Sequence, residues 1–484
     1  MKKSIIKTLQ STIQGDVFFQ KEFKEFYSVD ASSYQIIPKV IVVPKNENDV
    51  INVVKIAKKF KTSVTVRGAG TSLVGSSLNN GIILEMKNFD SIRLTKYHVT
   101  IGPGTSKGKL DKKLDEHKKF FPPNPSIGSF CSIGGMLGNN ASGSRSLKYG
   151  SVIDNVKEIT FIDGNGNKIT LPENKRVAKK ILEFARKIDR KKFPNVTKNS
   201  SGYRIDKVKS INDTHKVFIG SEGTLGIILS AKLNIKDKPR KRILFVIEYK
   251  IIKDAIKNCI EINKTKPSAI EFIDRTILKQ IKFKFDKKIK CLLFVEYDDK
   301  ISSNEKKIKL IITGKIIKKL KTDSDISQWW KYRDLSLHYS LKSMKKEKRI
   351  PHIIEDAAVP LENLQKLFLV LNKIKKKYKL RSIVYGHIGN GNIHVQLILD
   401  RKRIKTIKNI AIQYFEEVIK LQGTITAEHG DGLARSEFVK KQFGAKNYQV
   451  FKEIKKFFDP KNVLNPDKVI TKKSTIVENL KIFR

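Results

Sequence analysis

Cysteine is scarce in this chain, as are acidic residues and long apolar runs. The 484 residues contain three cysteines, Cys131, Cys259 and Cys291, and no CxxC pair. This spacing argues against a disulfide framework, a structural zinc site and an internal iron–sulfur cluster, and it favours a reducing intracellular setting. No stretch approaches the roughly 18 consecutive apolar residues of a membrane-spanning helix. The N-terminus, MKKSIIKTLQSTIQGD, also lacks the apolar run of a secretory signal.

The shortage of acidic residues gives the chain a formal net charge of +50, from 98 Lys and Arg against 48 Asp and Glu. Three interpretations are open: compositional drift, weak association with an anionic membrane face, and binding to nucleic acid. Lysine is spread over the whole length, without a basic arm or a zinc-finger spacing. This diffuse charge favours drift and argues against specific nucleic-acid recognition. We therefore expect a cytoplasmic protein with at most a peripheral contact to the anionic inner membrane.

Shifts in composition divide the chain into segments. Residues 1–35 are polar and predict an N-terminal helical extension. Over residues 40–66, two short apolar runs flank a helical repeat between Val50 and Ala57, which predicts a strand–helix–strand unit. The charged junction DKPRKR, at residues 237–242, is followed by strands that alternate with amphipathic helices. We therefore expect an α+β protein of two or three units, with a second α+β domain beyond this junction.

The first glycine-rich motif is RGAGTSLVG, from Arg67 to Gly75, directly after a predicted strand. Its glycines let backbone N–H groups converge on phosphate oxygens, and Thr71 and Ser72 add hydroxyl donors. It is neither the G-x-G-x-x-G dinucleotide motif nor a Walker loop. A plain turn remains the alternative for this motif alone.

Two further glycine-rich segments have the same character. One begins at PPNPS, residues 122–126, and continues through GGMLGNNASG, residues 134–143; the other is GSEGTLG, residues 220–226. Small side chains allow a planar ring or a pyrophosphate to lie against the backbone. Loops this long inside a compact domain are usually functional, although a flexible linker is the alternative.

Three of the eight histidines lie in the last two motifs, GHIGNGNIH at residues 386–394 and AEHGDGLAR at residues 427–435. The G-N-G-N core predicts a hairpin turn, so that the two histidines of the first motif sit on opposing strands and can converge. Two imidazoles and a carboxylate form a plausible divalent-metal site, and a spare imidazole beside it suits a general base. Histidines with purely structural roles are the alternative.

The order of these motifs resembles that of the flavin-dependent D-2-hydroxyacid dehydrogenases, the group of D-lactate dehydrogenase, the glycolate oxidase flavin subunit and D-2-hydroxyglutarate dehydrogenase. The resemblance runs from about residue 38 to about residue 470 and also includes DPKNVLNPDK near the C-terminus. It implies an FAD-binding domain of the vanillyl-alcohol-oxidase type, with two subdomains, over residues 36–237. It further implies a substrate, or cap, domain with an antiparallel sheet over residues 238–450. Residues 451–484 would return to the FAD domain.

The segments IEDAAVP and AEHGDGLARSEFV are most similar to the flavin half of fused FAD and iron–sulfur members of the family. The chain ends where the iron–sulfur half would begin, and its three scattered cysteines cannot supply a cluster. On this resemblance we expect electrons to leave to a separate acceptor, such as a quinone, an electron-transfer flavoprotein or an iron–sulfur protein. The substrate would be a small 2-hydroxy acid.

The resemblance assigns site residues one by one. His387, His394 and Glu428 would bind a divalent metal such as Zn, Mn or Fe, and His429 would be the catalytic base. Arg333, in WWKYRD, would grip the substrate carboxylate, and Arg435 is a second candidate for this role. The residues that would contact FAD are Arg67, Gly68, Gly70, Thr71, Ser72, Gly75, Pro122, Gly134, Gly135, Asn139, Ser142, Gly143, Gly223, Thr224, Gly226 and Asn465. The RGAGTS loop contains no His or Cys that could tether the flavin, so we expect non-covalent FAD.

Three departures from the family pattern affect the substrate prediction. The usual G-D-G-N is Gly389-Asn-Gly-Asn392, which removes one carboxylate, and the tail has Asn465-Pro-Asp-Lys468 where N-P-G-K is usual. A lysine found in some hydroxyglutarate enzymes is replaced by the Ile-Glu-Asp of residues 354–356, which argues against a dicarboxylic substrate. Alternative functions are an FAD-dependent alcohol or sugar oxidase, an ether-lipid synthase of the same fold, and a non-enzymatic basic flavoprotein.

Overall fold

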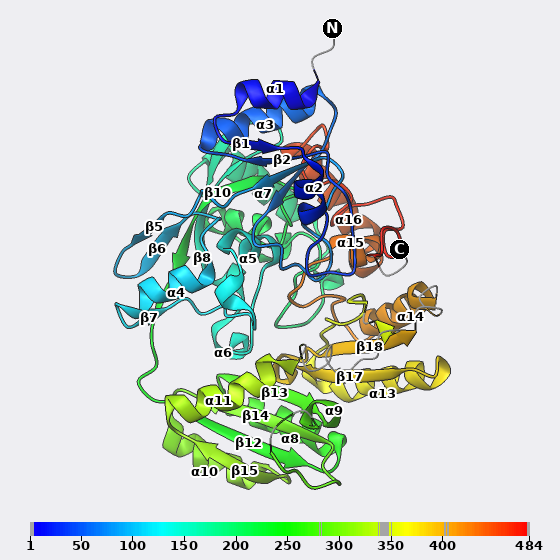
Figure 1. Ribbon diagram of the computed structural model, residues 1–484. Coiled ribbons are helices and arrows are strands. Elements are labelled where there is room, and N and C mark those ends of the chain that lie inside the picture. The colour runs from blue at the N-terminus through cyan, green and yellow to red at the C-terminus, as the bar shows by residue number, and fades with distance from the viewer. Residues whose placement is uncertain are drawn as a thin grey trace.

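The computed structural model describes residues 4–481, apart from 280, 282, 337, 339–347, 350, 401–402 and 404–405. Figure 1 shows two bodies, with the N-terminal half of the chain in one and a large sheet in the other. Among the described residues, no helix is both long enough and apolar enough to cross a membrane.

The first sheet contains the predicted strand–helix–strand unit. Its strands follow the order β1 (Asp16–Phe18), β2 (Val40–Val43), β4 (Ile82–Glu85) and β3 (Val64–Arg67), and β4 pairs in parallel with both β2 and β3. Helix α3 (Glu47–Lys59) begins at Asn46, whose side chain accepts the Asp49 N–H, and it buries Val50, Val53, Val54 and Ala57. The predicted helical repeat is therefore the face that packs on this sheet.

The N-terminal segment contributes more than helices. Helices α1 (Ile5–Thr12) and α2 (Lys21–Tyr27) were expected, but β1 between them pairs antiparallel with β2. The prediction of a purely helical extension over residues 1–35 missed this strand. A strand of three residues is too short to show an alternating pattern in the sequence.

The second sheet is antiparallel, with the order β5 (Ile92–Leu94), β6 (His98–Ile101), β10 (Ile227–Asn234), β8 (Val156–Ile162) and β9 (Lys168–Leu171). Strands β8 and β9 form an antiparallel hairpin whose turn contains the Asp163-Gly164 and Asn165-Gly166 pairs. The helices of this region are α4 (Lys107–Asp115), α5 (Ile133–Asn139), α6 (Ser146–Tyr149) and α7 (Lys175–Lys187). A short antiparallel ribbon pairs β7 (Lys119–Phe120) with β11 (Lys236–Asp237).

The third sheet confirms the predicted antiparallel cap. Its order is β15 (Lys315–Leu320), β12 (Ile243–Tyr249), β14 (Cys291–Tyr297), β13 (Ala269–Asp274), β17 (Arg381–Gly386), β18 (His394–Asp400) and β16 (Lys348–Arg349). Helices α8 (Ile252–Asn263), α10 (Ile301–Ile311), α13 (Leu364–Lys377) and α14 (Ile407–Lys420) pack on one face. Helices α9 (Arg275–Leu278) and α11 (Asp323–Asp334) pack on the other face, which also carries the polar residues of the site.

The chain returns to the FAD-binding half through α15 (Gly432–Arg435) and α16 (Val439–Phe458) (Figure 1). Helix α16 is broken at Gly444, where φ is 76°. On both sides of this break its apolar residues belong to the core of the second sheet, and Phe458 contacts Phe161 and Phe218. The tail continues to the N-terminal segment, where the Tyr34 hydroxyl donates to the Ile476 carbonyl.

Candidate active site

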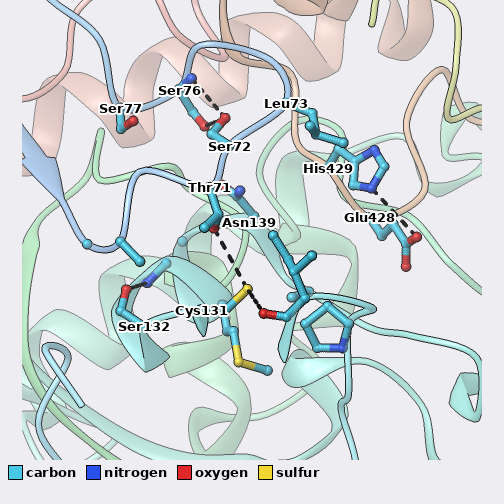
Figure 2. A pocket seen from close by; sticks show the side chains of 18 of the residues that line it. Thr71, Ser72, Leu73, Ser76, Ser77, Cys131, Ser132, Asn139, Glu428 and His429 are labelled. Carbon is cyan, nitrogen blue, oxygen red and sulfur yellow. Dashed lines mark hydrogen bonds and ion pairs between the residues drawn. The ribbon is translucent and has the colours of Figure 1, made fainter. Parts of the chain in front are cut away.

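One cavity lies where loops of the N-terminal half meet the cap. Its lining includes residues 66–73 and 134–136 from the first half, and Arg333, His387 and His429 from the cap. Figure 2 shows Glu428 and His429 on one side of this cavity, across from the loop that carries Thr71 and Ser72. Three motifs that are far apart in the sequence therefore face a single space.

Close approach of two loops explains why glycine occupies key positions of this cavity. A Cβ atom on Gly68 would lie 1.9 Å from Ser132 Oγ, and one on Gly143, where φ is +136°, would lie 2.1 Å from the Asn124 carbonyl oxygen. The lining therefore consists largely of backbone and of small hydroxyl side chains, such as those of Ser72 and Ser76.

An unpaired cation faces the same space. Arg67 lines the cavity, and its Nη1 is buried without a hydrogen-bond partner among the described residues, while Nη2 donates to the Val29 carbonyl. A buried donor of this kind is costly unless an acceptor reaches it. The pyrophosphate of FAD would supply such an acceptor, so these residues fit the cofactor that the sequence predicts.

The structure brings most of the predicted FAD residues to the cavity. Those that line it are Arg67, Gly68, Gly70, Thr71, Ser72, Gly134, Gly135, Asn139, Ser142, Gly143, Gly223 and Gly226. Cys131 also lines it, 3.7 Å from Thr71 Oγ1, and burial raises the pKa of its thiol. Burial therefore favours the protonated form of this thiol.

Four predicted FAD residues do not line the cavity. Gly75 instead packs beside Leu433, and Pro122 is buried behind the wall, where Pro125 lines the space in its place. The Thr224 hydroxyl donates to the Ser221 carbonyl. Asn465 Nδ2 donates to the carbonyl oxygens of Ser76 and Glu222, so this residue ties together two loops of the wall instead of facing the cofactor.

The carboxylate of Glu428 is the centre of the cap end of the cavity. Its Oε1 lies 3.0 Å from His387 Nε2, 3.1 Å from His394 Nε2 and 3.7 Å from His429 Nε2. Its Oε2 accepts from Ser142 Oγ at 2.5 Å and from Lys198 Nζ at 2.9 Å. The hairpin and the AEHG segment therefore converge as the sequence predicts, with all three imidazoles presenting Nε2 to one oxygen.

Carboxylates behind the imidazoles orient the rings. Glu271 Oε1 lies 2.7 Å from His387 Nδ1, and Glu355 Oε1 lies 2.6 Å from His429 Nδ1. The second oxygen of Glu355 is 3.4 Å from His394 Nδ1. A carboxylate on Nδ1 fixes the proton there and leaves the Nε2 lone pair free for a metal or a proton.

The same carboxylates set the charge of the site. Burial opposes the charged form of His429, but Glu355 and Asp356 outweigh it and raise the pKa of this histidine to about 9. Burial alone would also raise the pKa of Glu428, yet Lys198 and His387 hold it well below its usual value. The cluster therefore combines an ionised carboxylate with a strongly basic imidazole.

Asp356 anchors the segment that carries Glu428 and His429. Its Oδ2 accepts hydrogen bonds from the backbone N–H groups of Ala427, Glu428 and His429, at 2.9–3.1 Å, and from the Thr426 hydroxyl at 2.6 Å. One ligand atom each of Asp356, His394, Glu428 and His429 lies within 4.8 Å of the others. Because four donors already occupy its Oδ2, Asp356 is better explained as an anchor than as a metal ligand.

Arg333 and Arg435 have different surroundings. Arg333 lines the cavity, where its Nε donates to Glu271 Oε2 at 2.5 Å and its Nη1 donates to Ser126 Oγ at 3.1 Å. Arg435 is fully buried outside the cavity, and its guanidinium donates to Glu355 and to the Ile353 carbonyl. The interpretation of Arg435 as a substrate ligand is therefore wrong, because its donors are used inside the fold.

Two departures in the sequence have structural outcomes. The side chain of Asn390 bonds to Ser146 and Thr197, so the loss of an aspartate there removes nothing from the imidazole cluster. The Ile-Glu-Asp that stands where some relatives have a lysine does affect the cluster. Glu355 lies against the imidazoles and Asp356 anchors the segment with Glu428 and His429.

Several site residues were not predicted from the sequence. They are Lys198, Glu271 and Tyr385, together with the roles of Glu355 and Asp356. Lys198 is one of 98 basic residues and lies in an ordinary loop, so only its place in the small-residue run KNSSG could have drawn attention to it. Glu271 lies within an apolar strand, where an isolated charge is a usable signal, because buried carboxylates need a partner.

Comparison with known proteins agrees with this architecture. A family model described as FAD binding domain matches residues 38–171, and one described as FAD linked oxidases, C-terminal domain, matches residues 238–469. A solved structure of alkyldihydroxyacetonephosphate synthase superposes with a TM-score of 0.69 at 16% identity, covering 96% of this chain and 84% of that one. At that identity the likeness shows the fold alone.

Curated relatives extend over nearly the whole chain. The glycolate oxidase subunit GlcD of Bacillus subtilis is 27% identical over 92% of this chain and 92% of its own length. The mitochondrial D-lactate dehydrogenase (cytochrome) of Arabidopsis thaliana is 25% identical over 97% of this chain and 80% of its own. The D-2-hydroxyglutarate dehydrogenase of Haemophilus influenzae is 27% identical over 95% of this chain, which spans half of that protein's length. The chain therefore carries the FAD binding domain and the C-terminal domain of FAD linked oxidases, and over most of its length it is similar to glycolate oxidase subunits and to D-lactate and D-2-hydroxyglutarate dehydrogenases.

Proposed function

We propose that this chain oxidises a D-2-hydroxy acid, of the D-lactate, glycolate or D-2-hydroxyglutarate kind, to the 2-oxo acid. The observation that supports this best is the convergence of three imidazole Nε2 atoms on Glu428 Oε1, at the cap end of the cavity whose other walls are the FAD loops. Bound non-covalently, FAD supplies the acceptor for the hydride that leaves C2 of the substrate.

His387, His394 and Glu428 would hold a divalent cation such as Zn, Mn or Fe. Two imidazole nitrogens and a carboxylate oxygen form a common ligand set for these metals, with positions left open for substrate. Glu271 supports this assignment, since its hydrogen bond at His387 Nδ1 leaves Nε2 of that ring free. When bound, the cation supplies Lewis-acid polarisation of the substrate hydroxyl.

Arg333 binds the substrate carboxylate. Its guanidinium is planar and faces the cavity, and Glu271 on its Nε holds that plane in place. Ser126 lies beside Nη1 and adds a hydroxyl to the same wall. A carboxylate held here is close to the imidazole cluster, because Arg333 Nη2 is 3.2 Å from His387 Nδ1. A short 2-hydroxy acid would thus reach both groups.

The neutral form of His429 takes the proton of the substrate hydroxyl at Nε2. Glu355 and Asp356 raise the pKa of this histidine to about 9, and a cation held at Glu428 would favour the neutral form. Glu355 on its Nδ1 keeps the ring in the tautomer that can accept and stabilises the imidazolium that results. The two electrons then leave to a separate acceptor, which would be a quinone, an electron-transfer flavoprotein or an iron–sulfur protein.

An anaerobic absorbance titration tests the proposed reaction. FAD-loaded protein is mixed with D-lactate, glycolate, D-2-hydroxyglutarate and the L-enantiomers, with and without a chelator. We expect a D-acid to bleach the flavin band and the chelator to protect it. Bleaching by none of these acids, or by L-acids equally well, would contradict the proposal.

A further inference from the structure

A second cavity shares no lining residue with the first, although Asn195 and Gly423 on its wall lie only a few positions before Lys198 and Glu428. It has a volume of about 740 Å³, which is in the range of small-molecule sites. Residues 190–195 and 206–209 form one side, and the end of α14 with residues 441–444 of α16 forms the other. The break of α16 at Gly444 lies on this rim, where an added Cβ would meet no atom within 4 Å.

Its lining is strongly basic. The charged residues are Arg190, Lys191, Lys192, Lys207, Lys209 and Lys441, against one carboxylate, that of Asp206. Lys and Arg make up six of the fifteen lining residues, about twice their share of the whole chain, which is 98 of 484 residues.

The one carboxylate is already neutralised. Arg204, which does not line the cavity, donates from Nε and Nη2 to both oxygens of Asp206, at 2.9 and 2.8 Å. Arg190 and Lys441 are also engaged, with the Val208 carbonyl and with Glu416 respectively. Their charges are therefore partly used within the fold.

Four lysines remain without a counter-charge. Among the described parts of the chain, the Nζ atoms of Lys191, Lys192, Lys207 and Lys209 form no ion pair within 4.0 Å and no hydrogen bond. Like charges around one concave space repel each other, and an anion that enters relieves this repulsion. The charge of the cavity thus selects for a ligand with several negative charges.

The backbone around the cavity is held before any ligand arrives. Asn447 on α16 bonds to both the N–H and the carbonyl of Asp189, at 2.8 and 2.9 Å, and the Asn195 N–H donates to the Gln422 carbonyl at 3.0 Å. Phe193, Pro194 and Ile419 add half-buried apolar surface beside the lysines. A prearranged site loses less entropy on binding.

From these observations we propose that this basic cavity binds a small polyphosphate anion. Lysines act as point charges toward phosphate oxygens, which suits a flexible di- or triphosphate. The anion is either inorganic or the phosphate end of a nucleotide whose ring contacts Phe193, Pro194 and Ile419. This site is separate from the proposed oxidation, and binding there does not depend on it.

Calorimetric titration of the FAD-saturated protein with inorganic pyrophosphate and with ATP tests the proposal, since bound FAD blocks the first cavity. We expect one equivalent to bind, more weakly at higher salt. The double variant Lys191→Glu/Lys192→Glu should weaken binding at least ten-fold, while the matched charge change Lys306→Glu/Lys307→Glu on exposed positions of α10 should weaken it less than three-fold. Tighter binding of ATP than of pyrophosphate identifies a nucleotide, and equal binding identifies the phosphates alone.

Three results would overturn the proposal. The first is no binding of either anion below millimolar concentration. The second is an equal loss in the two double variants, which would show that only the overall charge matters. The third is binding to phosphatidylglycerol vesicles that depends on Lys191 and Lys192 without any binding of pyrophosphate, which would identify a membrane-facing surface instead. The flavin spectrum of each variant verifies that it has folded.

Discussion

Replacing Lys198 by methionine should destabilise the cap end of the site. Lys198 is 1% exposed in its side chain, and its Nζ lies 2.9 Å from Glu428 Oε2, which leaves Oε1 to face the imidazoles. Removing one partner of a buried ion pair typically costs about 3–5 kcal/mol, because the other charge is left uncompensated. The Ser142 hydroxyl and the nearby imidazoles still stabilise Glu428, so we expect a loss near the lower end, about 3 kcal/mol.

Both tryptophans of the chain, Trp329 and Trp330, lie on α11 and pack on the cap sheet, so their fluorescence reports unfolding of this body. Urea unfolding of chelator-treated protein at pH 8 would compare Lys198→Met, Glu428→Gln and the double variant. In the Glu428→Gln background, loss of Lys198 should cost about 1 kcal/mol or less, which gives a coupling energy of about 2 kcal/mol. A coupling energy below about 0.5 kcal/mol would refute the reasoning that these two charges compensate each other.

The remaining predictions concern cofactor binding, substrate binding and pH. Gly68→Ala should abolish tight FAD binding, because its Cβ would lie 1.9 Å from Ser132 Oγ, and adding Ser132→Ala should restore part of the binding. FAD titration by fluorescence measures both effects. Unchanged binding in Gly68→Ala would contradict the close approach of the two loops. Arg333→Lys should lower kcat/KM for the hydroxy acid about 10- to 100-fold by removing the planar fork. The control Arg242→Lys, at a half-buried arginine that pairs with Asp323 outside the cavity, should not; equal kinetics in the two variants would rule out the carboxylate contact. Burial lowers the pKa of His215 from 6.5 to about 4, so the folded protein resists a proton that the unfolded chain accepts. The stability this histidine provides is present above pH 6.5 and is lost as pH falls toward 4, by about 3 kcal/mol. As the pH falls from 7 to 4, the free energy of unfolding of His215→Gln, measured in urea, should rise by about this much relative to that of the wild type. A difference between the two proteins that does not change with pH would contradict the assignment.

The order of the motifs, through the family that it resembles, predicts the fold and the candidate site residues, whereas local motif chemistry predicts only the glycine-rich turns. The run of glycines after β3 needs a close backbone approach. The G-N-G-N segment forms a turn between β17 and β18, with His387 just after the end of β17 and His394 at the start of β18. Both inferences depend on neighbours within a few residues. The hairpin and the AEHG segment then meet at Glu428 as expected.

Contacts between distant segments could not be predicted in this way. Glu271 on β13 orients His387 from 116 positions away, and Lys198 reaches Glu428 across 230 positions. Arg435 is a residue for which the sequence suggested a role that its place in the fold does not support. It follows the histidine motif in the sequence, but its side chain is fully buried and donates to Glu355. Burial and direction of a side chain come from tertiary packing, which a single sequence does not contain.

The most direct test of the proposed chemistry is stopped-flow flavin reduction by a D-2-hydroxy acid in His429→Asn, with the surface variant His117→Asn as control. His429→Asn should retain the FAD spectrum and reduce flavin about 10²- to 10⁴-fold more slowly, which is the usual contribution of a general base. His117→Asn should match the wild type. Flavin reduction at the wild-type rate in His429→Asn would contradict the assignment of this histidine and with it the proposed mechanism.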